Sequence, residues 1–249
     1  FIATRWTLEI STPLATAFVR FAIAAAVTLP FIPRRAWNTQ FRLAAIPGLF
    51  LGLTLVLQTW GLKYTTATNS GFITTLYVLF VPLIEVFVGA RKIKFFHFIF
   101  VAIALIGTAL ICNIQRLEFN RGDALTLACA IAGAIQIFWI GRVARKITSS
   151  FAFNTFQAMW AAALPLLLGI ILSLTGEPIF ILKAASTEVT IRAYIGFFSL
   201  AIGSSLIAFL IQIRAQKVLS ASVASLIFLL ESPFAAFFAF YFFNEQLNP

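Results

Sequence analysis

Long apolar runs follow one another along the whole chain, and they constrain its fold more than any other feature. Each run is about 20 to 26 residues long, enough for a helix to cross roughly 30 Å of hydrocarbon. Apolar residues make up 61% of the 249 residues. A water-soluble fold of this size cannot bury so much apolar surface, so we expect a multi-pass membrane protein. The eight runs are Thr12–Ile32, Leu43–Leu62, Ala67–Ala90, Phe95–Ile114, Gly122–Gly141, Phe151–Thr175, Ile191–Ile213 and Val218–Phe243.

The runs do not alternate between polar and apolar residues, as barrel strands would, so the expected class is an all-α membrane bundle. The net charge of +10 does not indicate nucleic-acid binding, because the basic residues form short clusters between apolar runs. Four alternate loops hold most of these residues and no acid, which predicts that those loops are cytoplasmic. Their basic residues are Arg34, Arg35, Arg42, Arg91, Lys92, Lys94, Arg142, Arg145, Lys146, Arg214 and Lys217.

The chain also contains a weak internal repeat. Gln58 lies five residues before Lys63, and Gln212 lies five residues before Lys217. A proline, Pro82 or Pro233, interrupts the run that follows each lysine. The first member of each pair of runs enters the membrane from the side opposite to its partner. Two similar halves of opposite orientation predict an inverted repeat, an architecture typical of alternating-access carriers.

On these residues the sequence resembles the drug/metabolite transporter superfamily, in its EamA type. The resemblance rests on Pro13–Leu14 with Ala17–Phe21, on Gly61–Phe72 continuing to Pro82, on Arg121–Leu125, and on Ala221–Leu226 running to Pro233 and Asn244–Glu245. It implies a ten-helix bundle of two inverted repeats, of which about eight helices are visible. We expect the first repeat over residues 1–116, lacking most of its first helix, and the second over 117–249, lacking its last helix.

Three ionisable side chains lie inside apolar runs, where they are costly and face the protein interior. Glu85 and Glu231 lie near the two repeated prolines. They are either cavity carboxylates that take up protons or meet a substrate amine, or partners of basic residues such as Arg91. Arg20 matches an arginine at a helix start in the family. We interpret it as a structural charge that pairs with a carboxylate or with helix-end carbonyls.

A polar stripe on the third run predicts a face turned toward other helices or toward a cavity, since it cannot face lipid. At helical spacing, Ser70, Thr74, Tyr77, Val81 and Glu85 share one face. Interhelical hydrogen bonding is the alternative role for every polar side chain here. The predicted substrate pathway comprises Glu231, Glu85, Tyr77, Thr74, Ser70, Asn69, Gln58, Gln212 and Ser220.

The small residues Ala44, Gly48 and Gly52 recur every four positions and predict close helix packing. Motifs of metalloproteases, serine hydrolases and P-loop enzymes are absent from the sequence, and one His with two Cys gives little basis for a zinc site. We therefore expect no catalytic residues, metal or cofactor. The predicted function is secondary transport of a small organic metabolite, an amino acid or related compound, in a cell inner membrane. Export is the direction that the resemblance implies, and the residues themselves leave import and export open. The alternatives are a membrane-embedded enzyme, and a channel or structural membrane subunit.

Overall fold

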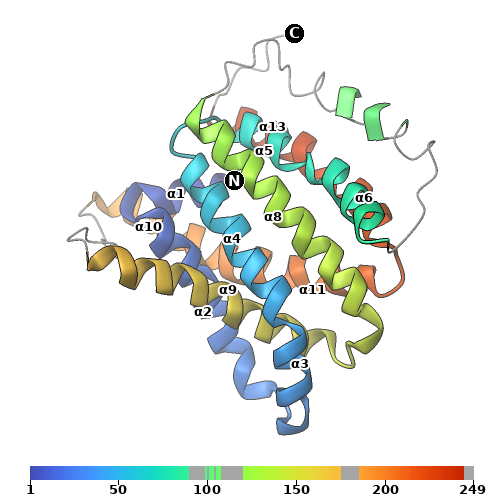
Figure 1. Ribbon diagram of the computed structural model, residues 1–249. Coiled ribbons are helices and arrows are strands. Elements are labelled where there is room, and N and C mark those ends of the chain that lie inside the picture. Colours follow the sequence, from blue (N-terminus) through green and yellow to red (C-terminus); the bar gives the residue numbers. More distant parts are fainter. Residues whose placement is uncertain (90–98, 100, 104, 108–119, 175–184, 244–249) are drawn as a thin grey trace.

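The computed structural model describes residues 1–89, 99, 101–103, 105–107, 120–174 and 185–243, and the described elements are helices (Figure 1). The first half contains α1 (Ile2–Ile10), α2 (Pro13–Thr28), η1 (Leu29–Phe31), η2 (Arg34–Ala36), α3 (Trp37–Leu43), α4 (Ala45–Gly61), α5 (Ala67–Thr74) and α6 (Tyr77–Phe87). The second half contains α8 (Arg121–Val143), η3 (Ala144–Lys146), α9 (Ser150–Ser173), α10 (Thr187–Phe198), η4 (Ser199–Ala208), α11 (Phe209–Gln216), α12 (Ala221–Phe228) and α13 (Glu231–Phe243).

Five helical segments of the described chain are long and apolar enough to cross a membrane, and a sixth is possible if one bent pair counts as a single span. The bent pair joins Arg34–Leu43 to Ala45–Gly61 at an angle of 62°, so the second predicted run starts just before a sharp bend. The five are Pro13–Phe31, Ala67–Phe87, Arg121–Lys146, Ser150–Ser173 and Thr187–Gln216. The fourth predicted run lies largely outside the described residues.

Polar side chains fix where several helices begin. Thr12, Ser149 and Ser220 accept hydrogen bonds from the first-turn backbone N–H groups of α2, α9 and α12. Asn120 and Asp123 form a reciprocal capping box at the start of α8. Such caps satisfy N–H groups that have no partner within the helix. They therefore mark the points at which the chain can enter an apolar span.

Glycines on α4 bring its backbone against two neighbouring helices. A Cβ atom at Gly48 would lie 2.5 Å from the Cβ of Trp160, and one at Gly52 would lie 2.6 Å from the carbonyl oxygen of Ala161. At the other end of α4, a Cβ at Gly61 would lie 2.9 Å from the carbonyl oxygen of Gly122. The close packing predicted from small residues in this run is confirmed. α4 is thereby held against α8 and α9 (Figure 1).

Two spans are interrupted in the same way. Two residues, Thr75–Leu76, separate α5 from α6, and two residues, Leu229–Leu230, separate α12 from α13. α13 packs against α5 while α12 packs against α6, so the two interrupted spans run antiparallel beside each other. The eighth predicted run is therefore two short helices rather than one. The prolines lie inside the helices that follow the breaks, at different distances from them.

A cluster of buried apolar side chains lies at the end of the bundle that carries the described basic loops, whereas Arg91, Lys92 and Lys94 lie outside the described residues. We call this cluster the basic-end seal. It comprises Ile32, Ala36, Ala44, Ile140, Ile147, Ala152, Phe153, Phe156 and Ile213. Polar contacts reinforce it: Lys217 Nζ donates to the carbonyl oxygen of Ile147 at 2.9 Å, and Trp160 Nε1 donates to that of Phe41 at 3.0 Å.

Candidate functional site

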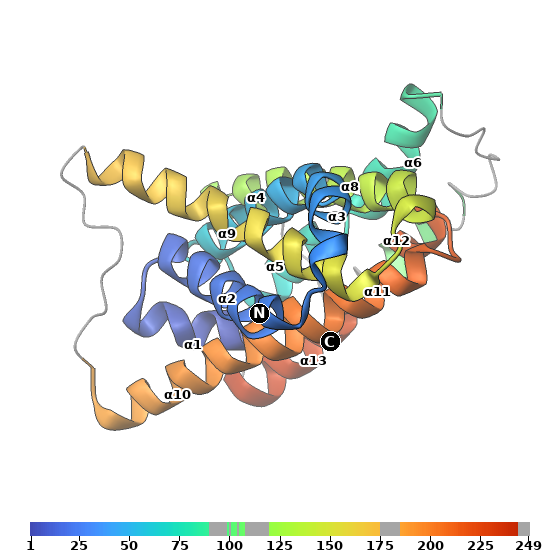
Figure 2. The same ribbon diagram turned by 90° about the horizontal axis from the view of Figure 1, so that it is seen from below.

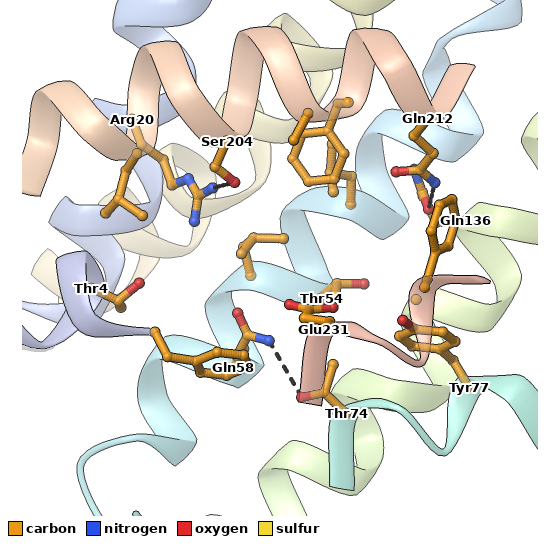
Figure 3. Close-up of a pocket in the computed structure, with 18 of the residues that line it drawn as sticks. Thr4, Arg20, Thr54, Gln58, Thr74, Tyr77, Gln136, Ser204, Gln212 and Glu231 are labelled. Carbon is orange, nitrogen blue, oxygen red and sulfur yellow. Dashed lines mark hydrogen bonds between the residues drawn. The ribbon is translucent and has the colours of Figure 1, made fainter. Parts of the chain in front are cut away.

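A cavity of about 590 Å³ lies inside the bundle, away from the basic-end seal (Figure 3). Its walls come from α1, α2, α4 and α8, from the η4 and α11 parts of the span α10–η4–α11, and from the residues that flank the breaks in the two interrupted spans. Figure 2 shows that span, in orange, on one side of the bundle and α4 and α8 on the other. The polar and charged side chains in the wall are Thr4, Arg20, Thr54, Gln58, Thr74, Tyr77, Gln136, Ser199, Ser204, Gln212 and Glu231.

Tyr77 and Glu231 enter the cavity from equivalent positions in the two interrupted spans, since each is the first residue of the helix after the break. Both come the same number of positions after a glutamine of the cavity wall, Gln58 for Tyr77 and Gln212 for Glu231. The Glu231 side chain is exposed to the cavity, whereas Tyr77 is buried, with 5% of its surface exposed. The Tyr77 hydroxyl faces the Glu231 carboxylate (Figure 3).

Amide side chains form a second polar feature of the wall. Gln58 Nε2 donates to Thr74 Oγ1 at 3.3 Å. On the opposite wall, Gln212 Nε2 donates to Gln136 Oε1 at 3.1 Å and to Gln216 Oε1 at 3.3 Å. These bonds hold the amides in fixed orientations. The lining thus presents both donors and acceptors to a small polar solute.

Arg20 is 2% exposed, and its partners differ from those expected. Its Nε donates to Ser205 Oγ at 3.0 Å and its Nη2 to Ser204 Oγ at 2.7 Å, rather than to a carboxylate or to helix-end carbonyls. Its guanidinium carbon also lies 5.2 Å from the centre of the Phe21 ring. Neither a carboxylate nor a helix-end carbonyl is thus in direct contact with Arg20 among the described residues, whose bonds to it come from two hydroxyls of η4.

The cavity brings together five of the predicted pathway residues: Gln58, Thr74, Tyr77, Gln212 and Glu231. The other four do not line it. Glu85 is buried and accepts a short hydrogen bond from Ser222 Oγ, which joins α6 to α12.

Ser70, Asn69 and Ser220 also lie outside the cavity lining. Ser70 is fully buried, Asn69 is half-buried, and Ser220 caps α12. The stripe Ser70 to Glu85 does face the protein, as expected. The break at Thr75–Leu76 places only its middle members, Thr74 and Tyr77, in the cavity wall.

Several lining residues were not anticipated from the sequence, notably Ser204, Thr54 and Gly133. Ser204 and Ser205 form a pair of small polar residues in the middle of an apolar run, and that pattern could have indicated them. They lie in η4, a π-helical segment. Such segments are rare and occur frequently at functional sites.

A smaller, mostly apolar pocket of about 380 Å³ adjoins the cavity between α1 and α13. It shares Phe1, Ala3 and Glu231 with the cavity and adds Ile2, Trp6, Phe234 and Phe238. Among the described residues, the site offers the Arg20 cation, the Glu231 carboxylate, several amides and hydroxyls, and apolar walls. This combination suits reversible binding of a small organic solute with both polar and apolar parts.

Comparison with known proteins agrees with this architecture. The EamA-like transporter family matches residues 1–113 and 120–249. An uncharacterized transporter of Archaeoglobus fulgidus is 29% identical over 242 residues, which cover 97% of this chain and 73% of the relative. A protein of known crystal structure shares the fold with a TM-score of 0.68 at 19% identity, over 99% of this chain and 84% of that protein. With both halves matched and its helices arranged as a membrane bundle, the chain belongs to the EamA-like transporter family.

Proposed function

We propose that the chain is a secondary transporter that moves a small organic metabolite, an amino acid or related compound, through the central cavity by alternating access. The observation that carries the proposal is the position of the cavity, where two interrupted spans meet. Interrupted helices expose backbone groups and carry solute sites in carriers of this kind. The cavity volume of about 590 Å³ lies within the range of small-molecule sites.

The proposal includes two inverted repeats, residues 1–116 and 117–249. Three pairs support this division: Thr66 with Ser220, Gln58 with Gln212, and Tyr77 with Glu231. The two members of each pair are separated by the same number of positions. In each half, the capped short helix and its two-residue break therefore recur at equal spacing.

The basic-end seal supports an assignment of conformation. The positive-inside rule places the basic loops in the cytoplasm, so a closed seal corresponds to a state in which the solute cannot reach the cytoplasm. Export from a cell inner membrane requires that this seal open to load the solute and close again to release it. Alternation between two such states is the defining property of a carrier.

Substrate counterflow in proteoliposomes tests the proposal. Vesicles that contain the purified protein are loaded with an unlabelled amino acid and diluted into a trace of the same labelled compound, one amino acid at a time. A carrier accumulates label transiently above equilibrium, because internal solute exchanges for external solute. A channel only equilibrates the label, and an enzyme converts it. Equilibration without overshoot for every compound would count against the proposal, and protein-free vesicles provide the baseline.

A further inference from the structure

The strongest feature left without a role is the guanidinium of Arg20 in the cavity wall. A cation out of water is costly unless an anion or well-aligned acceptors compensate it. Among the described residues, the acceptors are two neutral hydroxyls, Ser204 and Ser205. Glu231 is the acidic side chain that lines this cavity among the described residues. It makes no direct ion pair with Arg20. The Glu231 carboxylate attracts Arg20 across the cavity, but no anion of the described residues is in direct contact with the guanidinium.

The geometry leaves one edge of the guanidinium available. The two serines occupy the edge formed by Nε and Nη2. The other edge, formed by Nη1 and the second Nη2 hydrogen, meets no acceptor among the described residues. Figure 3 shows a guanidinium nitrogen pointing into the cavity beside the bond to Ser204. Two parallel N–H groups at such an edge match the two oxygens of a carboxylate.

The backbone that carries Ser205 is held by a buried amide of α9. Asn154 Nδ2 donates to the carbonyl oxygens of Ser205 at 3.3 Å and of Leu206 at 3.1 Å. These bonds tie the π-helical segment η4 to α9. The hydroxyls of Ser204 and Ser205 hold the Arg20 guanidinium in one orientation, and the Asn154 amide holds the backbone of Ser205. Support of this kind is typical of a preorganised ligand site.

We propose that Arg20 binds the carboxylate group of the transported solute, with Ser204 and Ser205 as its positioning residues. This inference rests on the proposed function, because it takes the cavity as the transport site. Glu231 and the Tyr77 hydroxyl lie elsewhere on the same cavity wall and suit a cationic or hydrogen-donating group of that solute. The apolar walls, which include Leu55 and Phe209, accommodate its remaining part.

The experiment compares acids with their amides. Thermal unfolding of the purified full chain in detergent is measured with each common L-amino acid, and then with the carboxamide of each one that stabilises. Acids are expected to stabilise and their amides are not. Titration calorimetry then gives Kd for the best acid. We expect R20Q to weaken binding roughly tenfold to hundredfold and R20K to retain part of it. R192Q, an exposed arginine paired with Glu188, is the control and leaves Kd unchanged.

The double variant S204A/S205A keeps the charge but releases the guanidinium, and we expect it to weaken acid binding about tenfold. If R20Q does not fold, the acid affinity of S204A/S205A tests the inference instead. Equal affinity for acid and amide, wild-type affinity in R20Q, or no stabilising acid would overturn the inference. The two failures are distinguishable. Arg20-dependent acid binding without counterflow rejects transport and leaves Arg20 as a carboxylate-binding residue of the cavity. Counterflow that R20Q does not alter rejects only the role of Arg20.

Discussion

Tyr77 and Glu231 are related by the internal symmetry of the chain: each begins the second helix of an interrupted span, and both line one cavity. The same structural position carries a phenol in one half and a carboxylate in the other. Symmetry-related backbone breaks thus create the site, and the asymmetry of their side chains determines which groups a solute meets there. Glu231 supplies the acidic group, and Tyr77 supplies a buried hydroxyl directed toward it.

The first prediction concerns Glu231. Its carboxyl can alternate between a charged and a neutral form, whereas the amide in Glu231→Gln stays neutral. Transport by the wild type is expected to change with pH, and transport by Glu231→Gln is expected to stay constant from about pH 5 to about pH 8. Counterflow rates across that range provide the measurement.

Glu9→Gln is the matched control for this variant, because Glu9 is exposed on α1 outside the cavity lining. It should keep the wild-type pH profile. Insertion and yield of both variants should match the wild type. A Glu231→Gln profile that coincides with that of the wild type at every pH would show that this carboxyl takes no part in transport.

The second prediction concerns cavity volume at Gly133. A Cβ atom here would lie 3.6 Å from Thr54 Cγ2, an ordinary contact, so Gly133→Ala should fold and transport. Gly133→Phe places a ring in the cavity and should reduce counterflow about tenfold or more by excluding solute. Ile131→Phe, on the exposed face of the same helix, adds a ring outside the cavity and should leave transport unchanged. Equal activity of the two phenylalanine variants would place the solute path elsewhere.

The sequence predicted the class of fold because lipid imposes a length and a composition on every span. It also identified Gln58, Gln212 and Glu231, since polar groups inside apolar runs are too costly to face lipid. It did not predict the break at Thr75–Leu76, because neither residue is a helix breaker. The sequence also did not indicate the contacts of Arg20 with Ser204 and Ser205. These contacts join spans that are far apart in the chain, and no local sequence pattern predicts them.

The third prediction tests the close approach of α4 and α9. An alanine at Gly52 would place its Cβ 2.6 Å from the backbone oxygen of Ala161, so the helices must separate. Overpacking of this kind costs about 1–3 kcal/mol, and Gly52→Ala should lower the thermal unfolding midpoint by several degrees. Gly133→Ala, which meets only ordinary contacts, is the control with the same chemical change. Equal midpoints for the two variants would mean that α4 and α9 are less tightly packed than the structure indicates.

The fourth prediction concerns orientation. Arg35 and Arg145 are exposed at the end of the bundle that carries the basic loops, whereas Lys63 is exposed at the opposite end. In a background without native cysteines, cysteine at Arg35 or Arg145 should react with a membrane-impermeant maleimide only after the cells are opened. Cysteine at Lys63 should react in intact cells. Reversed labelling would overturn the orientation derived from the positive-inside rule.

The last prediction concerns a buried amide on α9. The Gln157 side chain is fully buried, and neither end of its amide finds a hydrogen-bond partner among the described residues. An unpaired buried polar group costs about 1–3 kcal/mol, and methionine has a similar length without that cost. Gln157→Met should therefore raise the thermal unfolding midpoint by roughly 2–4 °C. Gln216→Met is the contrast, because the buried Gln216 amide donates to the carbonyl oxygen of Ile137 and accepts from Gln212. Its loss removes both bonds, so the midpoint should fall. If Gln157→Met instead lowers the midpoint or abolishes counterflow, this amide has a partner in another state of the transport cycle.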